Sequence, residues 1–170
     1  VWENDFDYLI DELTGFPISA TFSNNQVTST WIAEYKLDVF DLEGDMAIGD
    51  RAFASEPQDV VARAGAMLEG LTTAGLLCSL KHFPGQGSAR GDTHAKSVTI
   101  SKSLVHMRTH ALVPFVELCD RAPMVMMAHC IYPQVSTQEA CRSSEWISTI
   151  LRGELGFRGV VVSDDLTMGA

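Results

Sequence analysis

Apolar residues recur at helical spacing in three segments of this chain, and a short apolar run follows each segment. In the first, residues 60–71 place their apolar side chains on one face, and Ser55 and Gln58 upstream have the spacing of a capping box. Gly75 suits the position just beyond the helix, because glycine adopts a left-handed conformation without a steric penalty. The apolar run at residues 76–80 then predicts a buried strand.

The same order of elements occurs twice more. A second helix is predicted over residues 103–120, and the apolar run at residues 124–128 predicts a strand that ends at His129. A third helix is expected to begin near Ser143 and to lead into a strand at residues 160–162. Repeated units of helix, buried strand and polar loop are typical of parallel βα structure.

Titratable side chains follow the predicted strands directly: Lys81 and His82, then His129, then Asp164. Reactive groups at the carboxyl ends of several parallel strands are typical of a (β/α)8 barrel, whereas an open doubly wound sheet has them at fewer points. We therefore expect an α/β fold, a TIM-type (β/α)8 barrel. A further strand at residues 37–40 would bring the total to about four of the eight strands, so the barrel is expected to be incomplete in this chain.

The composition is that of a single globular unit, since 46% of the 170 residues are hydrophobic, and we treat residues 1–170 as one partial barrel domain. With 22 acidic and 12 basic residues the net charge is −10, which disfavours a nucleic-acid partner. No apolar run approaches the roughly 20 residues that span a bilayer. Four cysteines without a C-x-x-C pair are typical of reduced thiols, which favours a cytoplasmic location.

Asp92 and His94 form the first candidate catalytic pair. Two positions apart in an extended loop, they project the same way, so the carboxylate can hydrogen-bond the imidazole and raise its basicity. A histidine with a pKa near neutrality can protonate a leaving oxygen and later deprotonate water. The glycines Gly85, Gly87 and Gly91 indicate either a loop that moves over a substrate or an ordinary surface loop.

Asp164 is the second candidate catalytic group. The strand predicted directly before it would hold its carboxylate at the mouth of the barrel, where a nucleophile that attacks an anomeric carbon is expected. Its neighbour Asp165 is the alternative nucleophile, and an aspartate doublet after a strand can also be a helix cap.

The remaining candidates are positive or hydrogen-bonding side chains. Lys81 and His82 can bind sugar hydroxyls and keep nearby carboxylates ionised, or they are structural polar groups. The guanidinium of Arg51 can bind a substrate substituent or an active-site carboxylate. His129 ends a predicted strand and is expected to face the substrate or to support a residue that does.

Several of these motifs occur together in one order along residues 37–170. They are Gly-Asp-Arg-x-Phe around Arg51, Lys-His-Phe-Pro-Gly from Lys81, Asp-Thr-His at residues 92–94, Ala-His-Cys-Ile-Tyr-Pro around His129, and Leu-Arg-Gly-Glu-Leu-Gly-Phe followed by Ser-Asp-Asp-Leu at residues 163–166. In this order the chain resembles the bacterial β-N-acetylglucosaminidases of glycoside hydrolase family 3.

The resemblance implies a retaining hydrolase in which Asp164 forms a covalent glycosyl-enzyme and His94, paired with Asp92, replaces the usual carboxylic acid as acid/base. It implies a carbohydrate partner with a terminal β-linked N-acetylglucosamine, typically a muropeptide fragment in cell-wall recycling. No metal or organic cofactor is expected. The expected substrate-binding residues are Arg51, Lys81, His82 and His129.

Three features depart from the family pattern. Gln86 and Thr93 stand where the family usually has His and Ser. The upstream family segment that carries a sugar-binding Asp has its only counterpart in Ile-Asp-Glu-Leu, so Asp11 is carried over as the candidate for that role. The resemblance otherwise assigns nothing to residues 1–36.

Three alternatives remain open. The chain can be a truncated or inactive sugar-binding remnant of the same barrel. It can be a family 3 glycosidase of another specificity, such as a β-glucosidase, or a phosphorylase, because a His acid/base repels phosphate less than a Glu would. A hydrolase with zinc or manganese is the third alternative. Its metal ligands would come from His82, Asp92, His94, His129 and Asp164.

Overall fold

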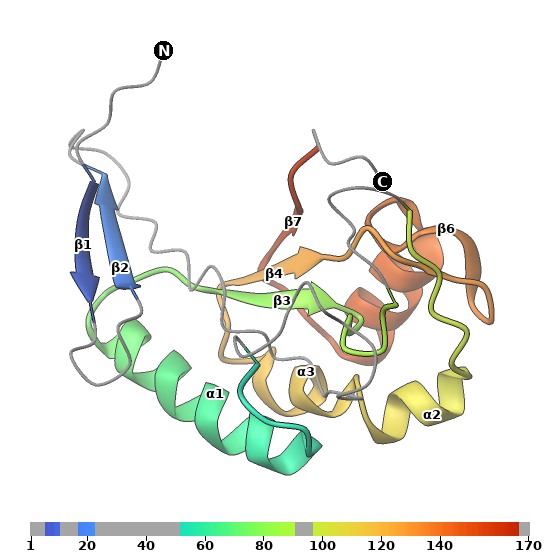
Figure 1. Cartoon of the computed structure of the whole chain (residues 1–170), viewed down its shortest axis with the longest axis horizontal. Coiled ribbons are helices and arrows are strands. Elements are labelled where there is room, and N and C mark those ends of the chain that lie inside the picture. Colours follow the sequence, from blue (N-terminus) through green and yellow to red (C-terminus); the bar gives the residue numbers. More distant parts are fainter. Residues whose placement is uncertain (1–5, 11–16, 23–51, 91–96, 167–170) are drawn as a thin grey trace.

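The computed structural model describes residues 6–10, 17–22, 52–90 and 97–166. Three strands form a parallel sheet in the order β3–β4–β7, and they comprise Ser79–Phe83, Met124–Met127 and Val160–Ser163. β4 lies in the middle, with Met124 beside Ser79 on one side and beside Val160 on the other. Helices precede each strand along the chain (Figure 1). The predicted α/β class with parallel strands is confirmed.

The first helix, α1, spans Pro57–Thr73 and matches its prediction closely. The residues that it buries are Val60, Ala64, Gly65, Leu68 and Leu71, which is the face that the spacing indicated. The predicted capping box is wrong, because Glu56 is the N-cap and no side chain caps it. Gly75 has φ +79° and allows the chain to turn, so that the Leu76 amide donates to the Leu71 carbonyl at 3.0 Å.

The strand β3 begins three residues later than the apolar run predicted. Leu77 is 45% exposed, whereas every residue of β3 is buried, including Lys81 and His82 at 9% and 5% exposure. The two polar residues therefore belong to the strand and not to the loop after it. Apolar content misplaced the strand because buried charged side chains are rare and are tolerated only where polar partners surround them.

The single helix predicted over residues 103–120 is two helices, α2 (Leu104–Thr109) and α3 (Val113–Leu118). Pro114 explains the break, since it has no amide hydrogen to donate to the carbonyl one turn earlier and is tolerated only in the first turn of a helix. His110 between them has a non-helical backbone. The helical spacing of apolar residues was predicted correctly, but it runs through the break between α2 and α3 and therefore does not reveal it.

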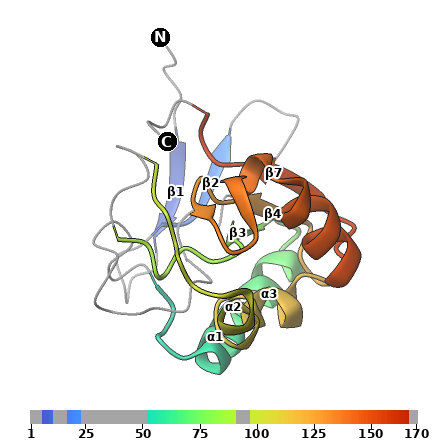
Figure 2. The same ribbon diagram turned by 90° about the vertical axis from the view of Figure 1, so that its right-hand side faces the viewer.

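After β4 the chain forms a hairpin that the sequence did not predict. β5 (Ile131–Tyr132) pairs antiparallel with β6 (Ser136–Glu139), and a 3-10 turn, η2 (Ala140–Arg142), follows. The third predicted helix is present as η3 (Glu145–Glu154), although its hydrogen-bonding pattern is that of a π-helix. In Figure 2 this hairpin and η3 lie together beside the sheet.

Four aromatic rings form the centre of the core. Phe83 at the end of β3 contacts Phe115 of α3 edge-to-face with ring centroids 5.1 Å apart, and it contacts Trp146 of η3 at 6.0 Å. Trp146 in turn lies 5.2 Å from Tyr132 of β5. All four side chains are fully buried. The carboxyl end of β3 is therefore held by a cluster of rings that come from α3, η3 and β5.

The first described residues form a separate two-stranded antiparallel sheet, with β1 (Phe6–Ile10) paired to β2 (Pro17–Phe22). The strand predicted at residues 37–40 lies outside the described residues. None of the helices within the described ranges combines the length and the apolar character that crossing a bilayer requires.

Candidate active site

The carboxyl edge of the parallel sheet brings together the predicted site residues that the structure describes. Lys81 and His82 lie at the end of β3, His129 follows β4 by two residues, and Asp164 follows β7. Because the three strands are parallel, their carboxyl ends share one edge. The other predicted residues lie outside the described ranges. They are Asp11, Arg51, Asp92 and His94.

Asp164 is held by two hydrogen bonds. The Nε2 atom of His82 lies 3.1 Å from one carboxylate oxygen, and the backbone amide of Asp165 donates to the other at 2.9 Å. Burial by itself raises the pKa of Asp164, but the hydrogen bond and charge of His82, the Asp165 amide and the charge of Lys81 outweigh it and hold the pKa well below its ordinary value. Asp164 is therefore an ionised carboxylate at neutral pH.

The sequence of β3 explains how a lysine and a histidine come to be buried beside this carboxylate. Successive side chains of a strand point to opposite faces, so Phe83 enters the aromatic core while its neighbour His82 faces Asp164. The peptide bonds before His82 and before Pro84 are cis. The Asp164 carboxylate partly offsets the cost of burying these polar side chains, because its hydrogen bond with His82 replaces contacts with water.

The turn after β3 is fixed by glycine. Gly85 has φ +121°, and a Cβ there would lie 2.5 Å from the Cβ of Ala111, so no other residue fits. The Gly85 amide donates to the His82 carbonyl at 2.7 Å, and the Tyr132 hydroxyl donates to the Gly85 carbonyl at 2.8 Å. The loop that carries Asp92 and His94 thus leaves the sheet from an anchored point.

On the other side of the site, Arg152 fixes the start of β7. Its guanidinium donates to the carbonyls of Phe157 and Gly159 at 3.0 and 2.7 Å and lies over the Phe157 ring. The strand that precedes Asp164 therefore begins at a turn that the Arg152 guanidinium holds in place. Sequence reasoning placed this arginine in a family motif without a role, although its position before a Gly-Phe turn was visible.

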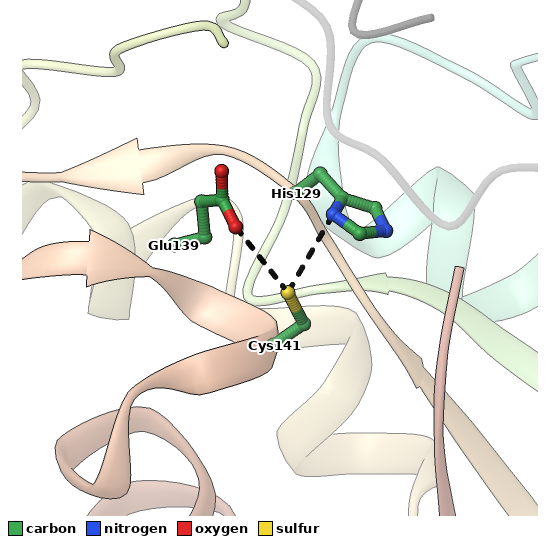
Figure 3. A group of neighbouring side chains, drawn as sticks. All are labelled: His129, Glu139 and Cys141. Carbon is green, nitrogen blue, oxygen red and sulfur yellow. Dashed lines mark hydrogen bonds between the residues drawn. The ribbon is translucent and has the colours of Figure 1, made fainter. Parts of the chain in front are cut away.

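His129 has neighbours that the sequence did not indicate. Its Nδ1 atom lies 3.6 Å from the sulfur of Cys141, and that sulfur lies 4.0 Å from Oε2 of Glu139 (Figure 3). Burial and the negative charge of Glu139 raise the pKa of the Cys141 thiol, and the charge of Asp164 adds to this. Cys141 therefore lies within electrostatic reach of the candidate nucleophile.

A cavity of about 180 Å³ lies on the other side of the Gly85 turn, next to α2. Gly85, Ser88, Ile100 and Lys102 contribute to its wall, and neither His82 nor Asp164 does. The candidate catalytic residues at the strand ends therefore lie outside this cavity. The cavity borders the Gly85 turn but does not reach Asp164.

Comparison with known proteins gives consistent matches. Residues 36–170 match the model of the glycosyl hydrolase family 3 N terminal domain. A β-hexosaminidase from Stenotrophomonas maltophilia (strain K279a) is 48% identical over 128 residues, which is 75% of this chain and 38% of that protein.

Solved structures agree with these matches. NagZ from Neisseria gonorrhoeae superposes with a TM-score of 0.73 at 40% identity, over 78% of this chain and 38% of that one. A family 3 β-N-acetylglucosaminidase from Paenibacillus sp. gives a TM-score of 0.76 at 34% identity, over 79% and 26%. The chain thus spans well under half the length of the relatives that it matches.

Proposed function

This chain belongs to glycoside hydrolase family 3, and on that premise we propose that it is part of the catalytic (β/α)8 barrel of a retaining β-N-acetylglucosaminidase. The observation that carries the proposal is the carboxylate of Asp164 directly after β7, hydrogen-bonded to His82, a contact that helps to lower its pKa. An ionised, oriented carboxylate at the carboxyl edge of a parallel sheet is what attack on an anomeric carbon requires.

In the proposed reaction the Asp164 carboxylate attacks the anomeric carbon, and a covalent glycosyl-enzyme forms as the bond to the leaving oxygen breaks. His94 gives its proton to that oxygen and then takes a proton from the water that releases the sugar. Asp92 orients His94 and stabilises its charged form. Retention follows because the sugar is displaced twice on the same carbon.

The sugar is held by side chains around the nucleophile. Lys81 and His82 supply hydrogen-bond donors beside Asp164, and their cationic character favours the carboxylate over its protonated form. Arg51, His129 and Asp11 are the further substrate-binding residues of the proposal. The substrate is a terminal β-linked N-acetylglucosaminide, of the kind that cell-wall fragments contain, and the compartment is the cytoplasm.

The test is release of p-nitrophenol from p-nitrophenyl N-acetyl-β-glucosaminide by the purified chain, its Asp164→Ala variant and, as a specificity control, the corresponding glucoside. We expect turnover of the N-acetylglucosaminide that vanishes in the variant. Preference for the glucoside would assign another sugar specificity. A folded chain that binds N-acetylglucosamine but turns over neither compound would be the inactive sugar-binding remnant.

A further inference from the structure

Among the residues that the structure describes, one group of side chains brings three metal-ligating atoms within 4.8 Å of one another: His129, Glu139 and Cys141. Figure 3 shows the three side chains converging from two segments of the chain, with the sulfur between the imidazole and the carboxylate. The grouping differs from the one that the sequence suggested, in which His129 shared a metal with His82 and Asp164.

The spacing fits a tetrahedral zinc ion. Zinc binds thiolate sulfur at about 2.3 Å and imidazole nitrogen at about 2.0 Å, so a tetrahedral site separates these two atoms by about 3.5 Å. The Nδ1 atom of His129 lies 3.6 Å from the Cys141 sulfur, and the carboxylate oxygen of Glu139 lies 4.0 Å from it. Only a small movement of the half-buried Glu139 carboxylate is needed to bring all three ligand atoms to zinc-binding distances.

The backbone holds the two segments in register. The Cys141 amide donates to the Ala128 carbonyl at 3.1 Å, and the Ala140 amide donates to the Cys130 carbonyl at 2.9 Å, on either side of His129. Glu139 is the last residue of β6 and pairs with Ile131 of β5. The ligands are thus preorganised by chain pairing and do not depend on side-chain contacts alone.

The surroundings favour a soft cation that can reach the site. His129 is 6% exposed, whereas Glu139 and Cys141 are half-buried, so the group is enclosed on one side and reachable from the other. At the sulfur the negative charges of Glu139 and Asp164 attract a cation, and the positive charge of Arg142 opposes them in part. A thiolate with an imidazole selects zinc over magnesium or calcium, which prefer oxygen ligands.

We propose that His129, Glu139 and Cys141 form a binding site for one zinc ion, with Nδ1, a carboxylate oxygen and the sulfur as ligands and the fourth position open to water. Cys141 binds as the thiolate, and its proton passes to solvent. The site is distinct from the proposed nucleophile, and it stands independently of the hydrolase activity because its test measures the metal directly.

Cobalt is the probe, because a thiolate bound to Co²⁺ gives a charge-transfer band in the near ultraviolet and oxygen or nitrogen ligands alone do not. The metal-free full chain is titrated with Co²⁺ and then with Zn²⁺. We expect the band to appear with one ion per chain and to disappear as Zn²⁺ displaces Co²⁺. Cys141→Ser is expected to abolish the band, and Cys119→Ala, which removes a buried thiol elsewhere, is expected to keep it.

Glu139→Gln should weaken zinc binding by more than the roughly 10–100-fold that loss of an outer-shell partner costs. Asp164→Asn should leave the band in place. Metal binding without a thiolate band, or binding lost in Asp164→Asn, would put the ion at the catalytic carboxylate and overturn the proposal, as would no binding at all. X-ray absorption of the zinc-loaded wild-type chain gives the same decision without any variant, since one sulfur ligand is expected and none would refute the site.

Discussion

Two buried histidines lie at the ends of neighbouring parallel strands, and they differ in the side chain that faces them. His82 and His129 are 5% and 6% exposed. The first lies 3.1 Å from the carboxylate of Asp164, and the second lies 3.6 Å from the thiol of Cys141. The two residues are of the same type, are similarly buried and lie at the same edge of the sheet. They differ in the side chain that each one faces.

The partner therefore decides what each histidine can do. A carboxylate accepts a charge-assisted hydrogen bond, so His82 orients Asp164 and keeps it ionised. A thiol is a weak hydrogen-bond partner but a strong ligand for soft metals once deprotonated, so His129 gains a different chemistry. A position at a strand end marks a residue as a candidate without fixing its role.

The largest expected effect comes from removing the carboxylate that sets the first histidine apart. Asp164→Asn should lower turnover of the aryl N-acetylglucosaminide by about 10⁴-fold or more, as loss of a covalent nucleophile does. Asp165→Asn is the matched control and should cost far less, because that residue contributes its backbone amide. Steady-state kinetics of both variants decide the matter, and the reverse ranking would move the nucleophile to Asp165.

The aromatic core packs against Phe83, the residue after His82, and weakening it should destabilise the fold. Phe115→Ala removes the ring that packs against Phe83 and should lower the free energy of unfolding by about 3–5 kcal/mol. Val116→Ala, on the exposed side of the same helix, should change it by less than about 0.5 kcal/mol. Urea denaturation measures both, and equal effects would show that the ring cluster does not hold the strand ends.

Exchanging each histidine for glutamine tests the comparison itself. His82→Gln should lower kcat by roughly 10–100-fold, since a hydrogen bond to a charged group contributes about 1.5–3 kcal/mol. His129→Gln should act mainly on KM and on cobalt binding. If the two variants showed the same kcat loss and His129→Gln kept the cobalt band, the difference between their partners would have no functional meaning.

The smallest expected effect is on stability in acid. Because the pKa of Asp164 is lowered on folding, its contribution is fully present above the ordinary value of 3.8 and is lost as the pH falls below it. The gap in unfolding midpoint between wild type and Asp164→Asn should therefore shrink as the pH falls from about 5 toward 3. A gap that widened in acid would mean that the folded chain prefers the protonated carboxyl.

The order of elements could be predicted from hydrophobic spacing, because α1, β4 and β7 follow it within a residue or two. Strand boundaries failed at β3, where Lys81 and His82 are buried against their expected preference. The sequence placed His82 and Asp164 at the carboxyl ends of two strands on the same edge of the sheet, but it did not predict the hydrogen bond between them.

The group around His129 could not be predicted in the same way. Cys141 lies 12 residues further along, and the two meet because the hairpin β5–β6 folds the chain back along itself. The exposed polar sequence of β6 gives no apolar alternation that would indicate a strand. Hydrophobic patterns in the sequence cannot predict contacts that depend on a turn which those patterns do not indicate.

The hydrogen bond from Tyr132 to Gly85 has a consequence for protein engineering. It holds the chain at Gly85, upstream of Asp92 and His94, and the Tyr132 side chain that donates it is fully buried in the core. Loop grafts, insertions or deletions made beyond Gly85 would leave the position of His82 unchanged. Changes to the segment that carries the proposed acid/base pair can therefore be tested separately from the described part of the site that holds the candidate nucleophile.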